Sequence, residues 1–192
     1  MVVLPASSKL TPDEFLAWER DQKDRHIYVG GEVFAMAGGS PRHNRLSARA
    51  IGRLERGVEG GPCGVYTSDQ RLGMPNDAFA YADAAVVCGP LTLRPGTTDV
   101  VTNPSVVLEV LSKSTETYDR GDKQKAYLSL PSLEHFVLVS QREARVEVYT
   151  RQADGSFRFD VLEGGATVHL ERVGVSFAVD DLYAGVFELP GD

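Results

Sequence analysis

Residues 106–111 read Val-Val-Leu-Glu-Val-Leu, a run that is too short for an ordinary helix and rich in β-branched residues. Apolar side chains occupy both alternating faces, so we expect a central strand that is covered on both sides. Glu109 lies in the middle of this run, where an unpaired buried carboxylate would cost several kcal/mol. A metal ion, a cation or a raised pKa must therefore compensate it. A buried ion pair, or a position at the exposed end of the strand, would explain Glu109 equally well.

The rest of the chain predicts a mixed sheet flanked by helices. Short apolar runs between loops rich in Gly, Pro, Asn and Asp indicate strands. We expect these strands over residues 26–29, 32–36, 65–67, 84–88, 134–139, 145–149, 157–162 and 167–170. Capping residues and Pro or Gly stops predict helices over residues 12–23, 42–56 and 118–130. With no linker or repeat, residues 1–192 are predicted to form a single α/β domain, an α+β mixed sheet with a β-rich C-terminal part.

Composition excludes several classes of protein. The chain is 42% hydrophobic and 24% charged, which is typical of a globular protein. It has no apolar run near the roughly 18 residues that cross a bilayer and no secretory signal, so we expect a cytoplasmic protein without membrane contact. Its net charge of −7 argues against a protein that coats nucleic acid through charge alone. Cys63 and Cys88 lack zinc-site spacing, and we interpret them as two buried free thiols rather than a disulfide.

Two further acids are candidates for a site beside Glu109. Asp83 immediately precedes the predicted strand 84–88, so two carboxylates would converge at one sheet edge if this strand neighbours the Glu109 strand. Hard oxygen ligands suit Mg²⁺ or Mn²⁺ and leave positions for a phosphate. Glu32 lies on the predicted core face of its strand, next to a Gly-Gly turn, and is a third candidate. The alternatives are that Asp83 is an ordinary turn residue and that Glu32 is a solvated turn residue.

The predicted helix over residues 42–56 carries arginines at helical spacing. These are Arg42, Arg45, Arg49, Arg53 and Arg56. They share one face and are candidates for phosphate contacts, although a solvated face that pairs with acids explains them as well. His43 falls on the apolar face, where it is either a hydrogen-bonded core histidine or a group that binds metal or positions a phosphate.

Lys123 falls on the apolar face of the predicted helix over residues 118–130, in line with Tyr127. A lysine in that place is uncommon without an anionic partner. Near Glu109 it would hold or deprotonate an attacking water. The alternative is a lysine that extends along its stem to solvent.

Several motifs together resemble a large bacterial family of restriction-endonuclease-like proteins, formerly a domain of unknown function, in the PD-(D/E)XK nuclease superfamily. The resemblance covers the chain from about residue 10 onward and is most specific over residues 109–127. The motifs are Gly31-Glu32, Pro41-Arg42-His43, Tyr81-Ala82-Asp83, Leu108-Glu109-Val110-Leu111-Ser112-Lys113-Ser114-Thr115, and Tyr118-Asp119-Arg120-Gly121-Asp122-Lys123 with Tyr127.

The resemblance implies a restriction-endonuclease-like core, a site that uses Mg²⁺ or Mn²⁺ without an organic cofactor, DNA as the substrate, and a homodimer. It implies metal ligation and catalysis by Glu32, Asp83 and Glu109, and catalysis by Lys123, with Tyr127 four residues further on. As our own hypothesis, Arg42, His43, Arg45 and Tyr127 contact the substrate. The chain departs from the superfamily pattern at Leu111, where a lysine usually stands, so Lys123 would supply the amine from the helix. A second departure is Ala82, where a proline is usual.

We therefore predict a divalent-metal-dependent endonuclease that hydrolyses phosphodiester bonds in DNA. The alternative is a catalytically silent binding or assembly module on the same fold, which Leu111 and the acidic net charge favour.

Overall fold

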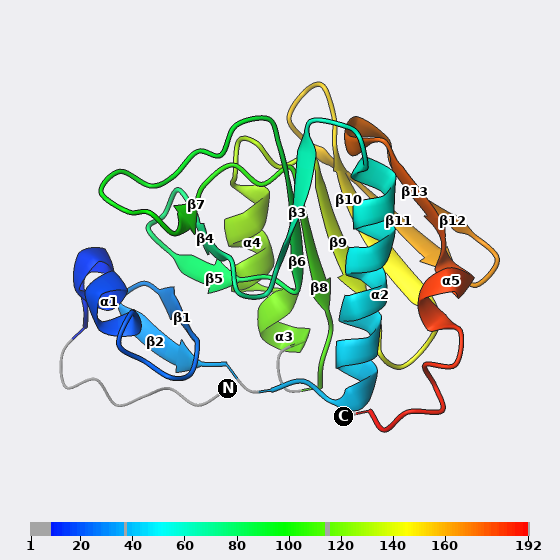
Figure 1. Ribbon diagram of the computed structural model, residues 1–192, viewed down its shortest axis with the longest axis horizontal. Coiled ribbons are helices and arrows are strands. Elements are labelled where there is room, and N and C mark those ends of the chain that lie inside the picture. The colour runs from blue at the N-terminus through cyan, green and yellow to red at the C-terminus, as the bar shows by residue number, and fades with distance from the viewer. Residues whose placement is uncertain (1–8, 37, 114–115, 192) are drawn as a thin grey trace.

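The main sheet has six strands in the order β11-β10-β9-β8-β6-β3 (Figure 1). The computed structural model describes residues 9–36, 38–113 and 116–191. Strands β8 and β9 pair in parallel and the other neighbours are antiparallel. The strands are β3 (Cys63–Thr67), β6 (Ala84–Cys88), β8 (Val106–Val110), β9 (His135–Val139), β10 (Arg145–Arg151) and β11 (Phe157–Glu163).

Two smaller sheets accompany the main one. A five-stranded sheet has the order β2-β1-β5-β4-β7, and a two-stranded sheet pairs β12 with β13. Their strands are β1 (His26–Val29), β2 (Glu32–Ala35), β4 (Arg71–Gly73), β5 (Phe79–Tyr81), β7 (Val100–Val101), β12 (Thr167–Leu170) and β13 (Val175–Ala178). Strands β4, β5, β7 and β13 were not predicted, because short strands in loop-rich sequence lack a clear alternation.

Two of the predicted helices are present with different bounds, the third is divided in two, and α5 was not predicted. They are α1 (Pro12–Glu19), α2 (Pro41–Val58), α3 (Glu116–Asp119), α4 (Asp122–Leu128) and α5 (Val179–Tyr183), with one 3-10 turn, η1 (Glu171–Val173). The prediction of one helix over residues 118–130 was wrong, because Gly121 breaks it into α3 and α4 with a non-helical ψ of −110°. A Cβ at Gly121 would lie 2.9 Å from the Thr117 carbonyl oxygen, so this break requires glycine. Within the described ranges, no helix is long and apolar enough to cross a membrane.

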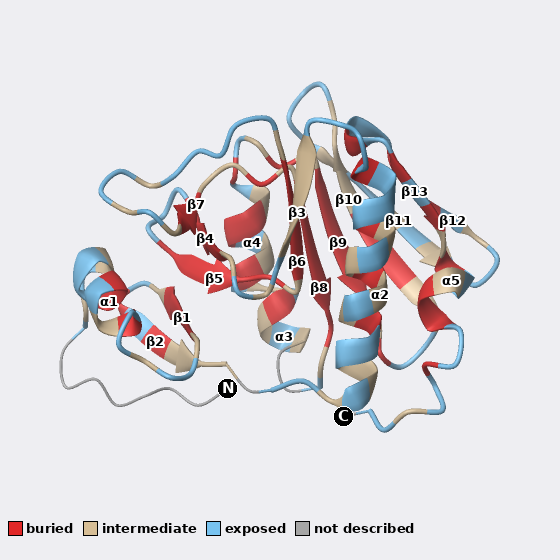
Figure 2. Ribbon diagram, viewed as in Figure 1, coloured by how far each residue is buried: buried red, intermediate tan, exposed pale blue. Residues whose placement is uncertain are grey.

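Both faces of the main sheet are covered, as the Val-Val-Leu-Glu-Val-Leu run predicted. One face packs against α2, the β12–β13 sheet and α5, and includes Val106, Leu108 and Val110 of β8. The opposite face packs against α4 and parts of β4 and β5, and includes Val107. Strands β6, β8 and β9 are accordingly buried along almost their whole length (Figure 2). Glu109 follows the alternation of β8 onto the α4 face.

The interpretation of the cysteines as free thiols was wrong. Cys63 and Cys88 lie directly opposite each other in the β3–β6 ladder and form a disulfide with an S–S distance of 2.06 Å. Their separation of 25 residues along the chain does not reveal which strands pair, so the sequence offered no sign that the two sulfurs meet.

Candidate functional site

The antiparallel register of β6 and β8 brings the two predicted acids together. Ala84 lies opposite Leu108 and Ala85 opposite Val107. One further step in this register places Asp83 opposite Glu109. Side chains in that relationship have Cβ atoms about 5 Å apart, and like charges there are destabilising. The surroundings of the acid pair, Asp83 and Glu109, must therefore compensate two negative charges.

Asp83 is tied to two elements. Its Oδ2 accepts a hydrogen bond from the Val110 N–H at 2.7 Å, which joins the start of β6 to the end of β8. The same oxygen lies 3.3 Å from Nε2 of His43, in the first turn of α2. The side chains of Asp83 and His43 are 15% and 16% exposed, so this edge of the site is open to solvent.

The negative charge of Glu109 is compensated by Lys123 of α4. Nζ of Lys123 lies 2.7 Å from Oε1 of Glu109 and 3.4 Å from Oδ1 of Asp119. All three side chains are at most 5% exposed. One ammonium group is therefore shared by two buried carboxylates.

Burial dominates the electrostatics of these groups. It raises the pKa of Glu109 to about 8, opposed by the charge of Lys123 and assisted by the charges of Asp119 and Asp83. Burial by itself lowers the pKa of Lys123, but the negative charges of Glu109 and Asp119 outweigh it and raise the pKa above its ordinary value. The raised pKa favours the protonated form of Lys123, in which the ammonium group donates hydrogen bonds and stabilises negative charge.

Tyr127 supports the lysine rather than facing solvent. It is fully buried, and its ring lies 5.9 Å from Nζ of Lys123 and 5.6 Å from the ring of Phe136. Burial, and then the negative charge of Glu109, raise the pKa of its hydroxyl well above the ordinary value. Tyr127 has no exposed surface with which to contact a substrate in this conformation.

The arginines of α2 do not form a free solvated face. Arg42 donates hydrogen bonds to the carbonyl oxygens of Leu189, at 2.8 Å, and Gln141, at 3.1 Å, and its guanidinium lies over the ring of Phe187. This side chain holds the C-terminal segment against α2. Arg45, one turn further along, is exposed.

Two more arginines of this helix bind the region of α5. Arg49 donates to the Asp181 carbonyl oxygen at 3.0 Å, and Arg53 lies 3.3 Å from the Asp181 carboxylate. Sequence spacing placed the arginines on one face correctly, but it could not show that the C-terminal segment packs there.

Glu32 belongs to the β1–β2 hairpin rather than to the paired strands that carry the acid pair. It is the exposed first residue of β2, opposite Val29, in a hairpin that lies beyond α3 from the end of β8 (Figure 1). Within the residues that the structure describes, no group of three or more His, Cys, Asp or Glu side chains is arranged to hold a metal ion. Ser114 and Thr115 of the family-like motif fall outside the described residues.

Sequence reasoning missed two residues at the site. Asp119 is buried four residues before Lys123, and this helical spacing is a signal that could have found it. Gln141 is 5% exposed and donates from Nε2 to the Leu111 carbonyl oxygen at 2.8 Å. Its Oε1 accepts from the hydroxyl of Ser40, the N-cap of α2. Gln141 thus joins the His43 helix to the end of the Glu109 strand, and nothing in the sequence pattern indicates it.

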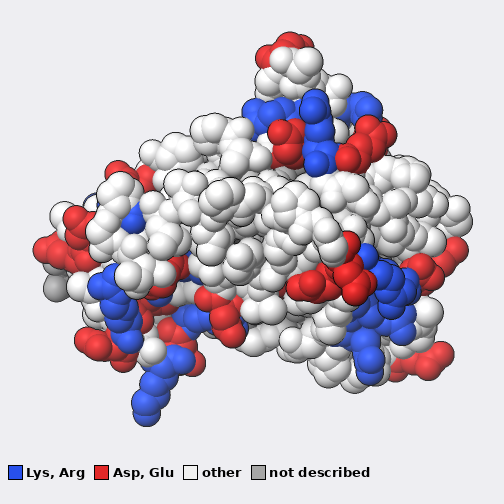
Figure 3. Space-filling model, turned by 45° about the horizontal axis from the view of Figure 1, so that its top comes forward, with Lys and Arg blue, Asp and Glu red and all other residues white. Residues whose placement is uncertain are grey.

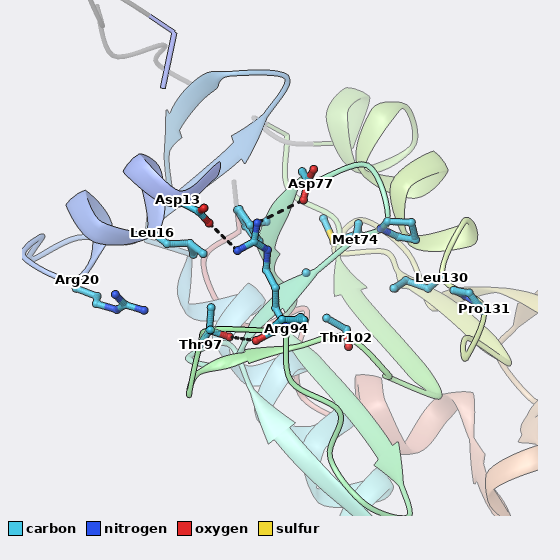
Figure 4. Close-up of a pocket in the computed structure, with 15 residues that line it drawn as sticks. Asp13, Leu16, Arg20, Met74, Asp77, Arg94, Thr97, Thr102, Leu130 and Pro131 are labelled. Carbon is cyan, nitrogen blue, oxygen red and sulfur yellow. Dashed lines mark hydrogen bonds and ion pairs between the residues drawn. The ribbon is translucent and has the colours of Figure 1, made fainter. Parts of the chain in front are cut away.

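The surface offers two further features. On the face in Figure 3, basic and acidic side chains lie next to one another in several small groups around a broad uncharged area, so no continuous basic surface is visible there. A cavity of about 760 Å³ lies between α1, the β4–β5 turn and the loop around Arg94 (Figure 4). Arg94 points into it, paired with Asp13 at 2.8 Å and Asp77 at 3.6 Å. None of the acid pair, Lys123 or His43 lines this cavity.

The protein thus has an α+β fold whose mixed sheet sets two acids opposite each other and whose covering helix supplies a lysine. The crystal structure of "a putative nuclease belonging to DUF820" from Anabaena variabilis ATCC 29413 has this fold, with a TM-score of 0.76 and 16% sequence identity. The superposition covers 92% of this chain and 99% of that one. The predicted fold class is confirmed.

The family model described as "Uma2: Putative restriction endonuclease" matches residues 12–180, and the chain belongs to this family. The predicted family resemblance is therefore confirmed, and the family supports a nuclease function in general terms. Two uncharacterized proteins of Synechocystis sp. are also similar. One is 35% identical over 179 residues, which cover 93% of each chain. The other is 29% identical over 165 residues, which cover 85% of this chain and 93% of that one.

Proposed function

We propose that this protein is a divalent-metal-dependent endonuclease that hydrolyses phosphodiester bonds in DNA. The observation that carries the proposal is the placement of Asp83 opposite Glu109 at the ends of two paired strands, with Lys123 at 2.7 Å from Glu109. Membership of a restriction endonuclease family supports DNA as the substrate.

The acid pair fits Mg²⁺ or Mn²⁺. Mg²⁺ is usually held by one or two carboxylates together with waters and substrate phosphates, so Asp83 and Glu109 are a sufficient protein contribution. A cation would also relieve the repulsion between two opposed carboxylates. Glu32 is not needed in this arrangement. A divalent cation held by the pair would supply positive charge to the substrate phosphate.

The remaining groups act on the phosphate by position and charge. Lys123 stays protonated and stabilises negative charge that develops on the phosphate during cleavage. His43 lies beside Asp83 at the N-terminus of the 18-residue helix α2, where the helix dipole favours an anion. Arg45 is exposed two residues after His43 in α2 and would contact the DNA backbone.

A second candidate is a catalytically silent binding or assembly module. It is favoured by the contact of Lys123 with Glu109 and Asp119, because the lysine already offsets their charge without a metal ion. Calorimetric titration with Mn²⁺ separates the two functions. The nuclease requires a saturable site that Asp83→Asn weakens, whereas the silent module requires none.

The nuclease function is tested by cleavage of supercoiled plasmid with and without Mg²⁺ or Mn²⁺. Asp83→Asn and Glu109→Gln should each reduce the metal-dependent rate by at least about 100-fold, as the loss of a single charge-stabilising group does elsewhere. Asp122→Asn is the matched control, because this exposed acid pairs only with Lys125 among the described residues. Full activity in both site variants would contradict the proposal.

The proposal extends to a homodimer. A symmetric pair of copies would provide two sites, one for each strand of a duplex.

A further inference from the structure

A row of aromatic side chains crosses the main sheet from the site to its edge. Tyr127, beneath Lys123, packs against Phe136 of β9. Phe136 lies directly opposite Tyr149 of β10, and Tyr149 lies directly opposite Phe159 of β11. The ring centroids of these two pairs are 6.0 and 4.7 Å apart. The row ends at Phe159, which is 48% exposed.

Strand β11 is an edge that the described part of the chain leaves open. It stands at the end of the strand order and pairs with β10 alone among the described strands. Figure 2 shows it exposed or half-buried along its length. Val161, which shares the face of Phe159, is 41% exposed. An edge with exposed apolar side chains is a template for pairing with another chain.

The sequence of β11 is complementary to itself. In an antiparallel pair of two copies about a two-fold axis at Phe159, this residue would lie opposite its own counterpart, and Phe157 would lie opposite Val161. On the other face, Arg158 would lie opposite Asp160 of the second copy, and the symmetry repeats this contact. Aromatic and opposite-charge pairs are the favourable cross-strand combinations.

The charges select this register. Moving the axis by one residue, to Asp160, would place Arg158 opposite Leu162 and remove both charge contacts. Charged residues on an edge strand commonly prevent pairing. Here the signs alternate, and Arg158 already donates to Asp160 at 2.7 Å within one copy. Pairing in the selected register therefore assembles two positive and two negative groups in alternation.

We propose that two copies of this protein associate through β11, antiparallel about a two-fold axis at Phe159, so that their main sheets become continuous. The contact is isologous, as expected for a two-fold dimer. It supplies a surface for the homodimer proposed above but does not depend on DNA cleavage. Asp83→Asn leaves β11 unchanged and should still form the dimer, so failure of the nuclease function and failure of this interface are measured separately.

Cysteine cross-linking tests the register. In the proposed dimer the two thiols of Phe159→Cys lie directly opposite, with Cα atoms about 4.5–5.5 Å apart, a separation that a disulfide spans. Val161→Cys is the matched control on the same face, because its two copies would be four residues out of step, about 13 Å apart. Cys63 and Cys88 are already joined to each other. Oxidation by copper phenanthroline, which removes two electrons and two protons per bond, should link Phe159→Cys but not Val161→Cys. Absence of the first link, or equal linking of both, would overturn the register.

Sedimentation of charge-reversal variants tests whether the partner of β11 is the same strand of a second copy. The unmodified protein should be a dimer at micromolar concentration. Arg158→Asp and Asp160→Arg should each be monomeric, because each sets like charges opposite one another, and an equimolar mixture of the two should recover a dimer. Circular dichroism confirms that both variants are folded. A monomeric parent protein, dimeric single variants, or a mixture that stays monomeric would each overturn the proposal.

Discussion

Nζ of Lys123 lies 2.7 Å from Oε1 of Glu109, and both side chains are 5% exposed. The same ammonium lies 3.4 Å from Asp119. The site therefore contains one cation and several acids whose charges offset one another. A change to any one member alters the charge state of the others, and the first two predictions rest on this dependence.

Replacement of Lys123 should destabilise the fold. Lys123→Met leaves Glu109 and Asp119 buried without their cation, and breaking one side of a buried pair costs about 3–5 kcal/mol. Urea unfolding measures the change in free energy of unfolding. Lys125→Met is the matched control in the same helix, since Lys125 is 80% exposed and its replacement should change stability by less than about 0.5 kcal/mol.

Above pH 8, where Glu109 is ionised in the parent protein, combining Lys123→Met with Glu109→Gln should recover part of the lost stability, because the second change removes the acid that Lys123 compensates. If the changes in free energy of unfolding caused by the two single substitutions simply add in the double variant, the two residues are not coupled.

Metal affinity should depend on pH. Burial raises the pKa of Glu109 to about 8, and a protonated carboxyl group does not ligate a metal. Mn²⁺ affinity should therefore rise between about pH 6 and pH 9, with release of protons on binding. Calorimetry in buffers of different ionisation enthalpy counts those protons. An affinity that stays constant across this range, with no proton release, would contradict the role of Glu109 as a ligand.

His135 should make the fold sensitive to acid. Its side chain is buried, with Nδ1 3.2 Å from the Thr150 hydroxyl, and burial, assisted by the charges of Arg172 and Arg158, lowers its pKa from 6.5 to about 4. The unfolded chain binds this proton more readily than the folded one. The stabilisation is therefore complete above pH 6.5 and is lost as pH falls toward 4, by up to about 3 kcal/mol.

Urea unfolding over that pH range measures the loss. His135→Gln cannot take up the proton, so its stability should fall less steeply between these pH values. Parallel profiles for the two proteins would show that His135 does not contribute.

Arg42 should contribute to the stability of the fold, whereas Arg45 should contribute to DNA binding. Arg42→Met removes hydrogen bonds to the partly buried carbonyl oxygens of Gln141 and of Leu189 in the C-terminal segment, and should cost about 1–3 kcal/mol of stability. Arg45→Met should leave stability unchanged, weaken DNA binding and reduce its dependence on salt. Unfolding curves and fluorescence anisotropy with a DNA duplex measure the two effects. Loss of DNA affinity in Arg42→Met at unchanged stability would reverse this assignment.

Local patterns predicted much of this site. The Val-Val-Leu-Glu-Val-Leu run identified a strand buried on both faces, and the helical alignment of Lys123 with Tyr127 identified a buried lysine. Both inferences depend only on residues close together in the chain, where periodicity determines which side chains share a face.

The remaining features depend on residues that are distant in sequence. The Cys63–Cys88 disulfide follows from the pairing of β3 with β6, and the binding of Arg42 follows from a C-terminal segment nearly 150 residues away. Gln141 joins three separate segments. Pattern and propensity do not determine such contacts, because they arise only when the strand order is known.

The proposed nuclease function depends most directly on a divalent cation between Asp83 and Glu109. Crystals soaked in Mn²⁺ and measured at the manganese absorption edge would locate the ion by its anomalous signal. We expect one peak within ligand distance of both carboxylates, with Lys123 in contact with Glu109 or the ion's waters, and no peak at Glu32. A strong peak elsewhere, or none at saturating Mn²⁺ with Asp83 and Glu109 unchanged, would contradict the central claim.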